Sequence, residues 1–410
     1  MQPKPLNQQY FFGVGLRSMA FQLWIIGMPL YFQESVGPLS EFSEALVLST
    51  LGCGLGMLLA FSGRKATDPA RRGRFFDLLQ LTAITLYFLS ISLSSTCNFW
   101  LLTGLLFVIQ VCYGAWLVTN EATVSTCVKE SGSVKLFHNN FTAVMLGGFI
   151  GAVAAEFIYK AGGLHIFFGI FGALVLISYW LQRPFLGQVS WSGFNREKSR
   201  GGLQCILASK ALLNMTLFGV CNRVLIMGMI PFAAYIVNSR ATGQGYVTLI
   251  IGLFQLGLIL GGLRIVCKRF SRRLKHPFAV LVGSIVVLGA TIAFGLKLEL
   301  GFYLVGTLLF ALGVLVARNA IPMRALRILV TDREAISSVV GVQSLCFYFA
   351  SPLSGIVLGA FFSEGYQVMG VSGLLLAYVA FVLAACGYIR QMHLGFSDNL
   401  MGLEPSNKKP

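Results

Sequence analysis

Long apolar segments recur along this 410-residue chain, and they constrain its fold more than any other feature. A helix needs about 20 mostly apolar residues to cross roughly 30 Å of hydrocarbon. Backbone exposed to lipid must form its hydrogen bonds within its own segment, so each crossing is expected to be an α-helix. We predict twelve spans, at residues 10–32, 42–62, 76–96, 99–120, 139–159, 164–182, 211–237, 245–263, 277–296, 300–318, 337–361 and 367–389.

The composition supports a membrane protein and excludes an ordinary water-soluble domain. Mean hydropathy is +0.76, and only 11% of residues are charged, whereas soluble domains carry about a quarter. The nine cysteines include no CxxC pair and suggest no disulfide framework. The N-terminal apolar stretch lacks the small-residue cleavage site of a signal peptide, so we expect it to be the first span.

The basic residues predict the orientation of the chain. In a soluble protein, a net charge of +16 would suggest binding to nucleic acid. A nucleic-acid-binding surface has its Lys and Arg concentrated on one face of a domain, whereas here they lie in short loops between apolar segments. With the N-terminus inside, 26 of the 31 basic residues lie in inside segments and three in outside loops. This positive-inside pattern predicts a multi-pass protein of the cell membrane with both termini cytoplasmic. The small loops and the missing targeting signal suggest a bacterial inner membrane. The lipid bilayer is then a partner, and nucleic acid is not.

The chain contains an internal repeat. The sequence FGVGLR at 12–17 recurs as FGVCNR at 218–223, and other short matches share an offset of 201 to 206 residues. Two parallel six-span repeats are the plan of one large transporter architecture. The predicted domains are an N-terminal six-helix bundle, a cytoplasmic linker, a C-terminal six-helix bundle and a cytoplasmic tail, at 1–182, 183–210, 211–390 and 391–410.

The loop after the second span, GRKATDPARRGR at 63–74, resembles the loop signature of the major facilitator superfamily, a Gly followed by an Asp and by basic residues around a second Gly. The resemblance extends over essentially the whole chain. It implies an all-α membrane protein of twelve transmembrane helices in two pseudo-symmetric six-helix bundles. In the family this loop restrains the alternation between inward-open and outward-open states. The corresponding gating residues are Gly63, Asp68, Arg72, Gly73 and Arg74.

Glycines four residues apart, such as Gly147 and Gly151, allow helix backbones to approach closely. The resemblance implies that the fifth span, which carries them, lies at the contact between the two halves. Ordinary helix packing is the alternative.

Arg17 and Arg223 are the basic residues that lie within predicted spans away from the span ends. A charge at the centre of a membrane helix costs about 2.5–3.5 kcal/mol on insertion scales, so it needs a reason. The repeat places both arginines at equivalent positions, facing each other across the pseudo-twofold axis, where two guanidinium groups would clamp an anion. This pair resembles that of organophosphate antiporters within the superfamily. The alternatives are that each arginine pairs with a buried carboxylate, Glu121 being a candidate for Arg17, or snorkels.

Other side chains share the face of the first arginine. Phe21 and Trp24 follow Arg17 by four and seven residues, and Gln110 and Tyr113 form a helical stripe with Glu121 in the fourth span. Plain helix packing is the alternative. The predicted substrate-binding residues are Arg17, Arg223, Phe21, Trp24, Gln110 and Tyr113.

A proton-coupled carrier needs a group that can take up a proton in or near the cavity. Burial in a membrane favours the neutral form of a carboxyl group, and a histidine titrates near neutral pH. The coupling candidates are Glu121, Glu156 and His138. Asp77 is expected to cap or pair at the cytoplasmic end of the third span.

These patterns predict a secondary active transporter, working by alternating access, for a small organic anion such as an organic acid, an organophosphate or a carboxylate-type siderophore. Protons are the expected coupling partner. We expect a monomer that is not an enzyme and needs no cofactor or metal, since HExxH, GxSxG and P-loop motifs are absent from the sequence. The alternatives are an efflux carrier for amphipathic or cationic compounds and a lipid flippase of the same fold.

Overall fold

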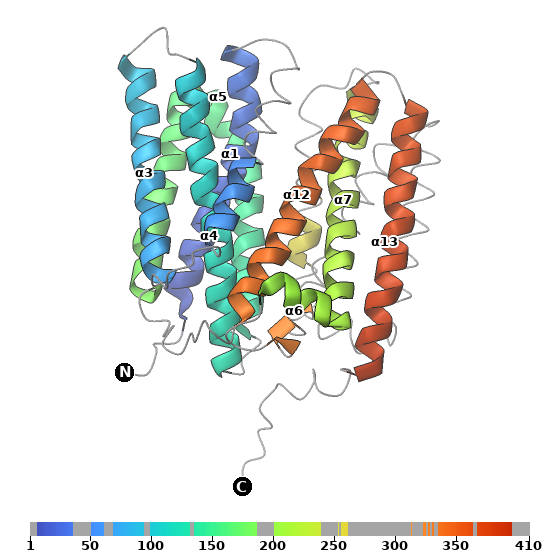
Figure 1. Ribbon diagram of the computed structural model, residues 1–410. Coiled ribbons are helices and arrows are strands. Elements are labelled where there is room, and N and C mark those ends of the chain that lie inside the picture. Colours follow the sequence, from blue (N-terminus) through green and yellow to red (C-terminus); the bar gives the residue numbers. More distant parts are fainter. Residues whose placement is uncertain are drawn as a thin grey trace. The chain divides into compact units, whose positions relative to one another are not determined.

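In the computed structural model of the chain, all regular secondary structure among the described residues is helical. The described residues are 6–35, 51–60, 69–93, 99–131, 135–186, 201–238, 253, 256–260, 313, 323–324, 327–328, 330–331, 335–363 and 367–395. The labelled helices in Figure 1 are α1 (Gln8–Ser35), α3 (Pro69–Leu93), α4 (Phe99–Ser131), α5 (Lys135–Leu186), α6 (Gly202–Ala208), α7 (Lys210–Asn238), α12 (Ile336–Ser363) and α13 (Gln367–Gly395). A shorter apolar helix, Leu51–Ala60, lies in the predicted second span.

Several described helices are long and apolar enough to cross a bilayer. They are Thr103–Lys129, Lys135–Ala155, Ile166–Phe185 and Val368–Tyr388, and a further candidate is α6 with the first part of α7, bent by 106°. The predicted span 277–296 and nearly all of 300–318 lie outside the described residues. In the stretch that the sequence analysis treats as a linker, α6 is a short helix directly before α7.

Two of the predicted spans, 139–159 and 164–182, form one continuous element, α5. Gly163 interrupts its helical geometry with a φ of 63° and a ψ of −165°. A positive φ is readily accessible only to glycine, because any Cβ would clash with the backbone. Gly163 therefore joins two helical segments, each of which is a candidate span.

The chain divides into two compact units. Unit 1 comprises Met1–Ser131, Ala143–Cys205 and Thr331–Phe349, and unit 2 comprises Gly132–Thr142, Ile206–Val330 and Ala350–Pro410. The predicted boundaries of two six-helix bundles, a linker and a tail stay a prediction.

An aromatic core holds unit 1 together. Trp24 of α1 packs against Phe168 and Phe171 of α5, with ring centroids 5.9 and 5.1 Å apart, and Tyr87 of α3 packs on Phe168 at 4.9 Å. Aromatic rings in such tilted and edge-on pairs contribute packing energy beyond their buried area. The core therefore fixes α1, α3 and α5 around the polar residues described below.

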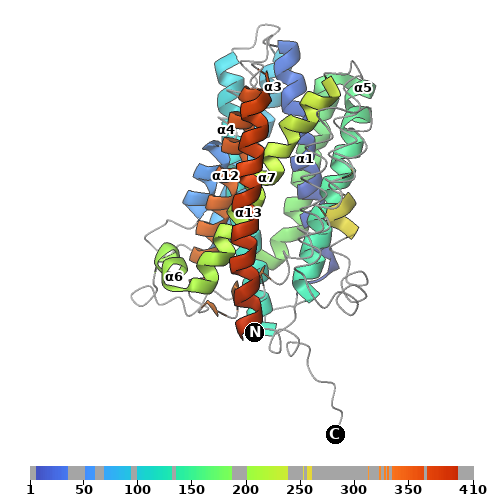
Figure 2. The same cartoon turned by 90° about the vertical axis from the view of Figure 1, so that its right-hand side faces the viewer.

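In unit 2, the described helices α7 and α13 pack against each other; they lie side by side in Figure 1, and α13 passes in front of α7 in Figure 2. Phe218 of α7 stacks on Phe381 and Tyr388 of α13, with ring centroids 5.5 and 5.0 Å apart. The side chain of Phe218 is buried, which places the repeated FGV sequence against a neighbouring helix.

Glycines let α5 touch the backbone of α1. A Cβ atom added to Gly147 would lie 2.0 Å from the carbonyl oxygen of Gly15, and one added to Gly151 would lie 2.6 Å from that of Met19. Ser18 Oγ donates a hydrogen bond of 2.7 Å to the carbonyl of Val144 at the same crossing. This glycine pair therefore packs two helices within unit 1, in agreement with the alternative of ordinary helix packing.

Candidate functional site

A small pocket lies among α1, α3, α4 and α5 of unit 1, with room for about one water molecule. Its lining mixes a charged group and amides with large aromatic rings. The lining residues are Arg17, Ala20, Phe21, Trp24, Gln80, Ile109, Gln110, Tyr113, Phe171 and Val175.

Arg17 is the charged group of this pocket, and its side chain is only 1% exposed. Its Nη2 atom forms an ion pair with Asp77 Oδ1 at 2.9 Å and donates a second hydrogen bond to Gln80 Oε1. Its Cζ atom lies 5.5 Å from the ring centroid of Trp116, within range of a cation–π interaction. The arginine is thus held by a buried carboxylate, an amide and an indole.

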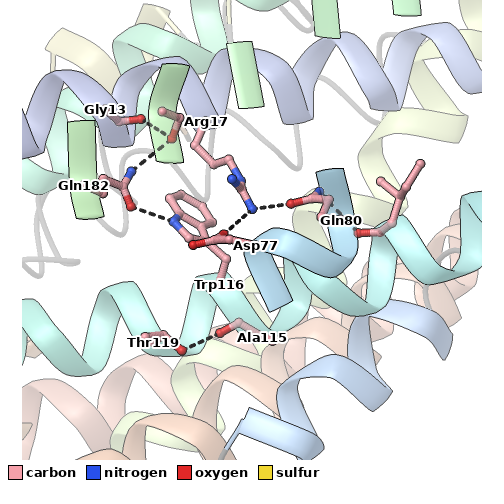
Figure 3. A network of polar contacts seen from close by, with 10 residues as sticks. Gly13, Arg17, Asp77, Gln80, Ala115, Trp116, Thr119 and Gln182 are labelled. Carbon is pink, nitrogen blue, oxygen red and sulfur yellow. Dashed lines mark hydrogen bonds and ion pairs between the residues drawn. The ribbon is translucent and has the colours of Figure 1, made fainter. Parts of the chain in front are cut away.

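The ion pair belongs to a longer polar network that crosses unit 1 (Figure 3). Trp116 Nε1 donates to Gln182 Oε1 at 3.0 Å, and Gln182 Nε2 donates to Ser178 Oγ at 3.2 Å. Ser178 Oγ donates to the carbonyl of Gly13 at 2.8 Å. Buried polar groups are costly unless they are hydrogen-bonded, so this network fixes the position of α1, and hence of Arg17, relative to α4 and α5.

Three polar atoms of the pocket residues remain buried without a hydrogen-bond partner in the described structure. They are two donors, Arg17 Nε and Trp24 Nε1, and one acceptor, Gln110 Oε1. Leaving a buried donor or acceptor unsatisfied costs about 1–3 kcal/mol. In a pocket of this size, one water molecule or one polar group of a larger ligand could satisfy these atoms.

Aromatic rings form one wall of the pocket. Phe21 stacks on Tyr113 with ring centroids 3.7 Å apart and planes inclined by 5°. Tyr113 in turn lies 5.5 Å from Trp116, which carries the cation–π contact. The wall connects α1 to α4 and continues to the guanidinium group.

The structure brings together five of the six predicted substrate-binding residues, because Arg17, Phe21, Trp24, Gln110 and Tyr113 all line this pocket. The sixth, Arg223, lies on α7 in unit 2, where its side chain is exposed. The anion clamp between the two arginines therefore stays a prediction, as does the assignment of these residues to substrate.

The predicted coupling residues have other surroundings. Glu121 is not the partner of Arg17; it acts electrostatically on Tyr10, whose hydroxyl donates a 2.7 Å hydrogen bond to Asn120. His138 is half-buried on α5 and interacts with other groups. The side chain of Glu156 lies outside the described structure.

Little of the predicted gating loop is described. Gly63 and Asp68 lie outside the described residues, and Arg72 and Gly73 are described only as part of helix α3. Arg74 is half-buried, and its Nε atom has no hydrogen-bond partner in the described structure.

Gln80 is not among the predicted site residues, and Asp77 is predicted only to cap or pair at the end of the third span, yet both contact Arg17. Both lie on α3, three residues apart, which places them on the same helix face. This spacing, two polar residues one turn apart inside an apolar helix, is the signal that could have identified them. In the residues described, no group of three or more His, Cys, Asp or Glu side chains is arranged to hold a metal ion.

Comparison with known proteins identifies the fold. No protein-family model and no curated protein matches the sequence. Among solved structures, the chain is similar to a bacterial homologue of the iron transporter ferroportin in the outward-facing state, with a TM-score of 0.69, 14% identity, and coverage of 94% of this chain and 98% of that chain. The same homologue with soaked iron gives a TM-score of 0.68 at 14% identity, with 93% and 100% covered.

A third similar structure is FucP, a major facilitator superfamily transporter in the outward conformation. Its TM-score is 0.65 at 14% identity, with 92% of this chain and 97% of that chain covered. The predicted fold class is confirmed: the chain is a multi-pass helical membrane protein with the fold of major facilitator superfamily transporters.

Proposed function

We propose that this protein is a secondary active transporter that moves a small organic anion across the membrane by alternating access, coupled to protons. The organic acids, organophosphates and carboxylate-type siderophores are the candidate substrates. One observation carries the proposal: a buried arginine lines a pocket with one of its N–H donors unsatisfied, beside an unsatisfied indole N–H. Two such donors suit a carboxylate or phosphate oxygen.

The fold supports the transport part of the proposal. Transporters built from two six-helix repeats hold substrate near the middle of the bilayer and expose it to each side in turn. Arg17 lies within α1 (Gln8–Ser35), two to three turns from its first residue. A charge at this depth in a membrane helix is a functional hypothesis by default.

A second candidate function is efflux of an amphipathic compound. The pair of Arg17 with Asp77 has no net charge, and the Phe21–Tyr113 stack offers an apolar surface. This combination favours a substrate with a flat apolar part and a small polar group. The two candidates differ in the charge of the substrate, which a transport panel measures directly.

The discriminating experiment is uptake into liposomes that contain the purified protein. The panel consists of radiolabelled citrate, succinate, glycerol 3-phosphate and inorganic phosphate, with a lipophilic cation and a neutral aromatic compound. We expect uptake of at least one organic anion above that of protein-free liposomes, and none of the cation. Transport of only the cation or the neutral compound would support the efflux carrier and contradict the anion proposal.

Trp24→Phe tests whether the pocket binds the transported anion. The indole N–H has no partner in the described structure, so its loss removes no protein hydrogen bond, whereas a hydrogen bond to an ion contributes about 1.5–3 kcal/mol. We expect the KM for the anion to rise about tenfold or more with little change in stability. Trp180→Phe is the matched control, because Trp180 is 71% exposed on the outside of the helices. Equal KM values for the two variants would place the anion elsewhere.

Arg223→Ala tests the second half of the clamp. If Arg223 contacts the anion in any state of the transport cycle, its loss is expected to reduce uptake at least tenfold. Arg183→Ala, which removes another exposed arginine at the end of α5, controls for loss of positive charge. Unchanged uptake by Arg223→Ala would restrict the anion site to unit 1.

A further inference from the structure

We infer that Asp77 is the residue at which proton uptake and substrate binding meet, because its carboxylate and the substrate anion compete for the guanidinium group of Arg17. This inference rests on the proposed function. It assigns proton coupling to a residue other than the coupling candidates Glu121, Glu156 and His138.

The geometry of the pair carries the argument. Asp77 and Arg17 are both nearly inaccessible to solvent, and they are 2.9 Å apart. A buried charge without a partner is strongly destabilising. The Nη2 atom of Arg17 contacts Asp77 and Gln80, its Nε atom is buried without a hydrogen-bond partner in the described structure, and the residue lines the pocket. One arginine therefore connects the carboxylate to the pocket.

The charges of the site explain why binding of an anion would be coupled to uptake of a proton. Arg17 lines the pocket and pairs with Asp77, so the positive and the negative charge of the pair neutralise each other. An anion that enters adds a negative charge to a low-dielectric site, where a second carboxylate disfavours ionisation of the first. Protonation of Asp77 removes the excess negative charge. The positive charge of the Arg17 guanidinium group is then balanced by the substrate anion.

Besides Arg17, the ionisable groups described around Asp77 on the neighbouring helices are a tyrosine and a cysteine. From α1 the described ionisable neighbour is Tyr10, and from α4 it is Cys112. Tyrosine and cysteine are ordinarily neutral near pH 7. Glu121 of α4 acts on Tyr10, Arg74 lies one turn before Asp77 on α3, and α5 contributes the apolar Phe171 and Val175 to the pocket.

The cycle balances in atoms and charge. A proton from water on the loading side bonds to a carboxylate oxygen of Asp77, and the ion pair opens as the anion binds Arg17. On the opposite side the anion leaves, the O–H bond breaks, the proton passes to water and the ion pair re-forms. Each anion bound is accompanied by one proton, so import of a monovalent anion moves no net charge.

The first test uses the unaltered protein. The anion with the highest uptake in the panel is added to purified protein in weakly buffered detergent solution at several pH values between about 5 and 9. We expect uptake of up to one proton per anion bound, and an affinity that falls as pH rises, since linkage makes the two effects reciprocal. Binding with no proton uptake at any of these pH values would overturn the inference.

The second test is Asp77→Asn. This variant is expected to exchange labelled for unlabelled anion across the membrane, with binding that no longer depends on pH, and to lose accumulation driven by a pH gradient. If the variant does not fold, Asp77→Glu replaces it, and we expect that variant to keep the proton uptake. Retention of proton-driven accumulation by Asp77→Asn, or its loss in Glu121→Gln instead, would assign coupling elsewhere.

The two proposals fail in different ways. If the unaltered protein moves no anion at all, the proposed function is wrong. If it moves an anion without taking up protons, the transport proposal stands and the role of Asp77 is rejected.

Discussion

Arg17→Leu is expected to reduce the free energy of unfolding by about 3–5 kcal/mol, because it leaves the carboxylate of Asp77 buried without its partner. Gln80 Oε1 loses a charged donor in the same variant. The measurement is thermal unfolding in detergent with a thiol-reactive dye. The buried, free thiols of Cys53 and Cys112 become reactive to such a dye only when the helices separate.

The double variant Arg17→Leu/Asp77→Leu separates the structural role of the pair from its proposed transport role. Replacing both members of a buried ion pair by apolar residues is often neutral or even stabilising, so we expect most of the lost stability to return. Anion uptake is expected to stay absent, because no guanidinium group remains in the pocket. A double variant as unstable as Arg17→Leu would show that the ion pair is not what the single substitution disrupts.

Gly147→Leu is expected to be the most disruptive of the glycine substitutions on α5. Even a Cβ atom would approach the Gly15 carbonyl oxygen to 2.0 Å, so α1 and α5 must move apart. Overpacking ordinarily costs about 1–3 kcal/mol and occasionally more, and here the atoms that must move belong to backbone rather than to a flexible side chain. We expect a lower melting temperature and a reduced yield of monodisperse protein on size exclusion.

Gly104→Leu is the control for that substitution. Gly104 lies on α4 with an exposed surface, and no atom lies within 4 Å of a Cβ atom built on it. The control is expected to unfold at the temperature of the unaltered protein. Equal melting temperatures for the two variants would mean that α1 and α5 do not cross at Gly15 and Gly147.

Much of unit 1 could be predicted because helical periodicity decides which residues of one helix share a face. The spacing of Phe21 and Trp24 from Arg17, and of Tyr113 from Gln110, predicted two polar and aromatic stripes, and the structure places both around one pocket. Apolar length predicted the two segments of α5 as separate spans. These are local properties of the chain.

The contacts between helices could not be predicted in the same way. Periodicity shows that Arg17 needs a partner but not which neighbouring helix supplies it, and the partner is Asp77 of α3 rather than Glu121 of α4. The repeat makes Arg17 and Arg223 equivalent in sequence, yet one is buried and the other exposed. Burial depends on tertiary packing, which two related segments need not share.

The ion pair also has a consequence for how the chain is made. Asp77 follows Arg17 by 60 residues, and at ribosomal rates of about 5–20 residues per second it is synthesised roughly 3–12 s later. During that interval the first helix carries a guanidinium group that has no carboxylate to neutralise it. Release of this helix into lipid would be opposed by the free-energy cost of placing the unpaired guanidinium charge in the membrane. The arrival of α3 therefore sets the earliest moment at which the N-terminal helix can settle at its final depth.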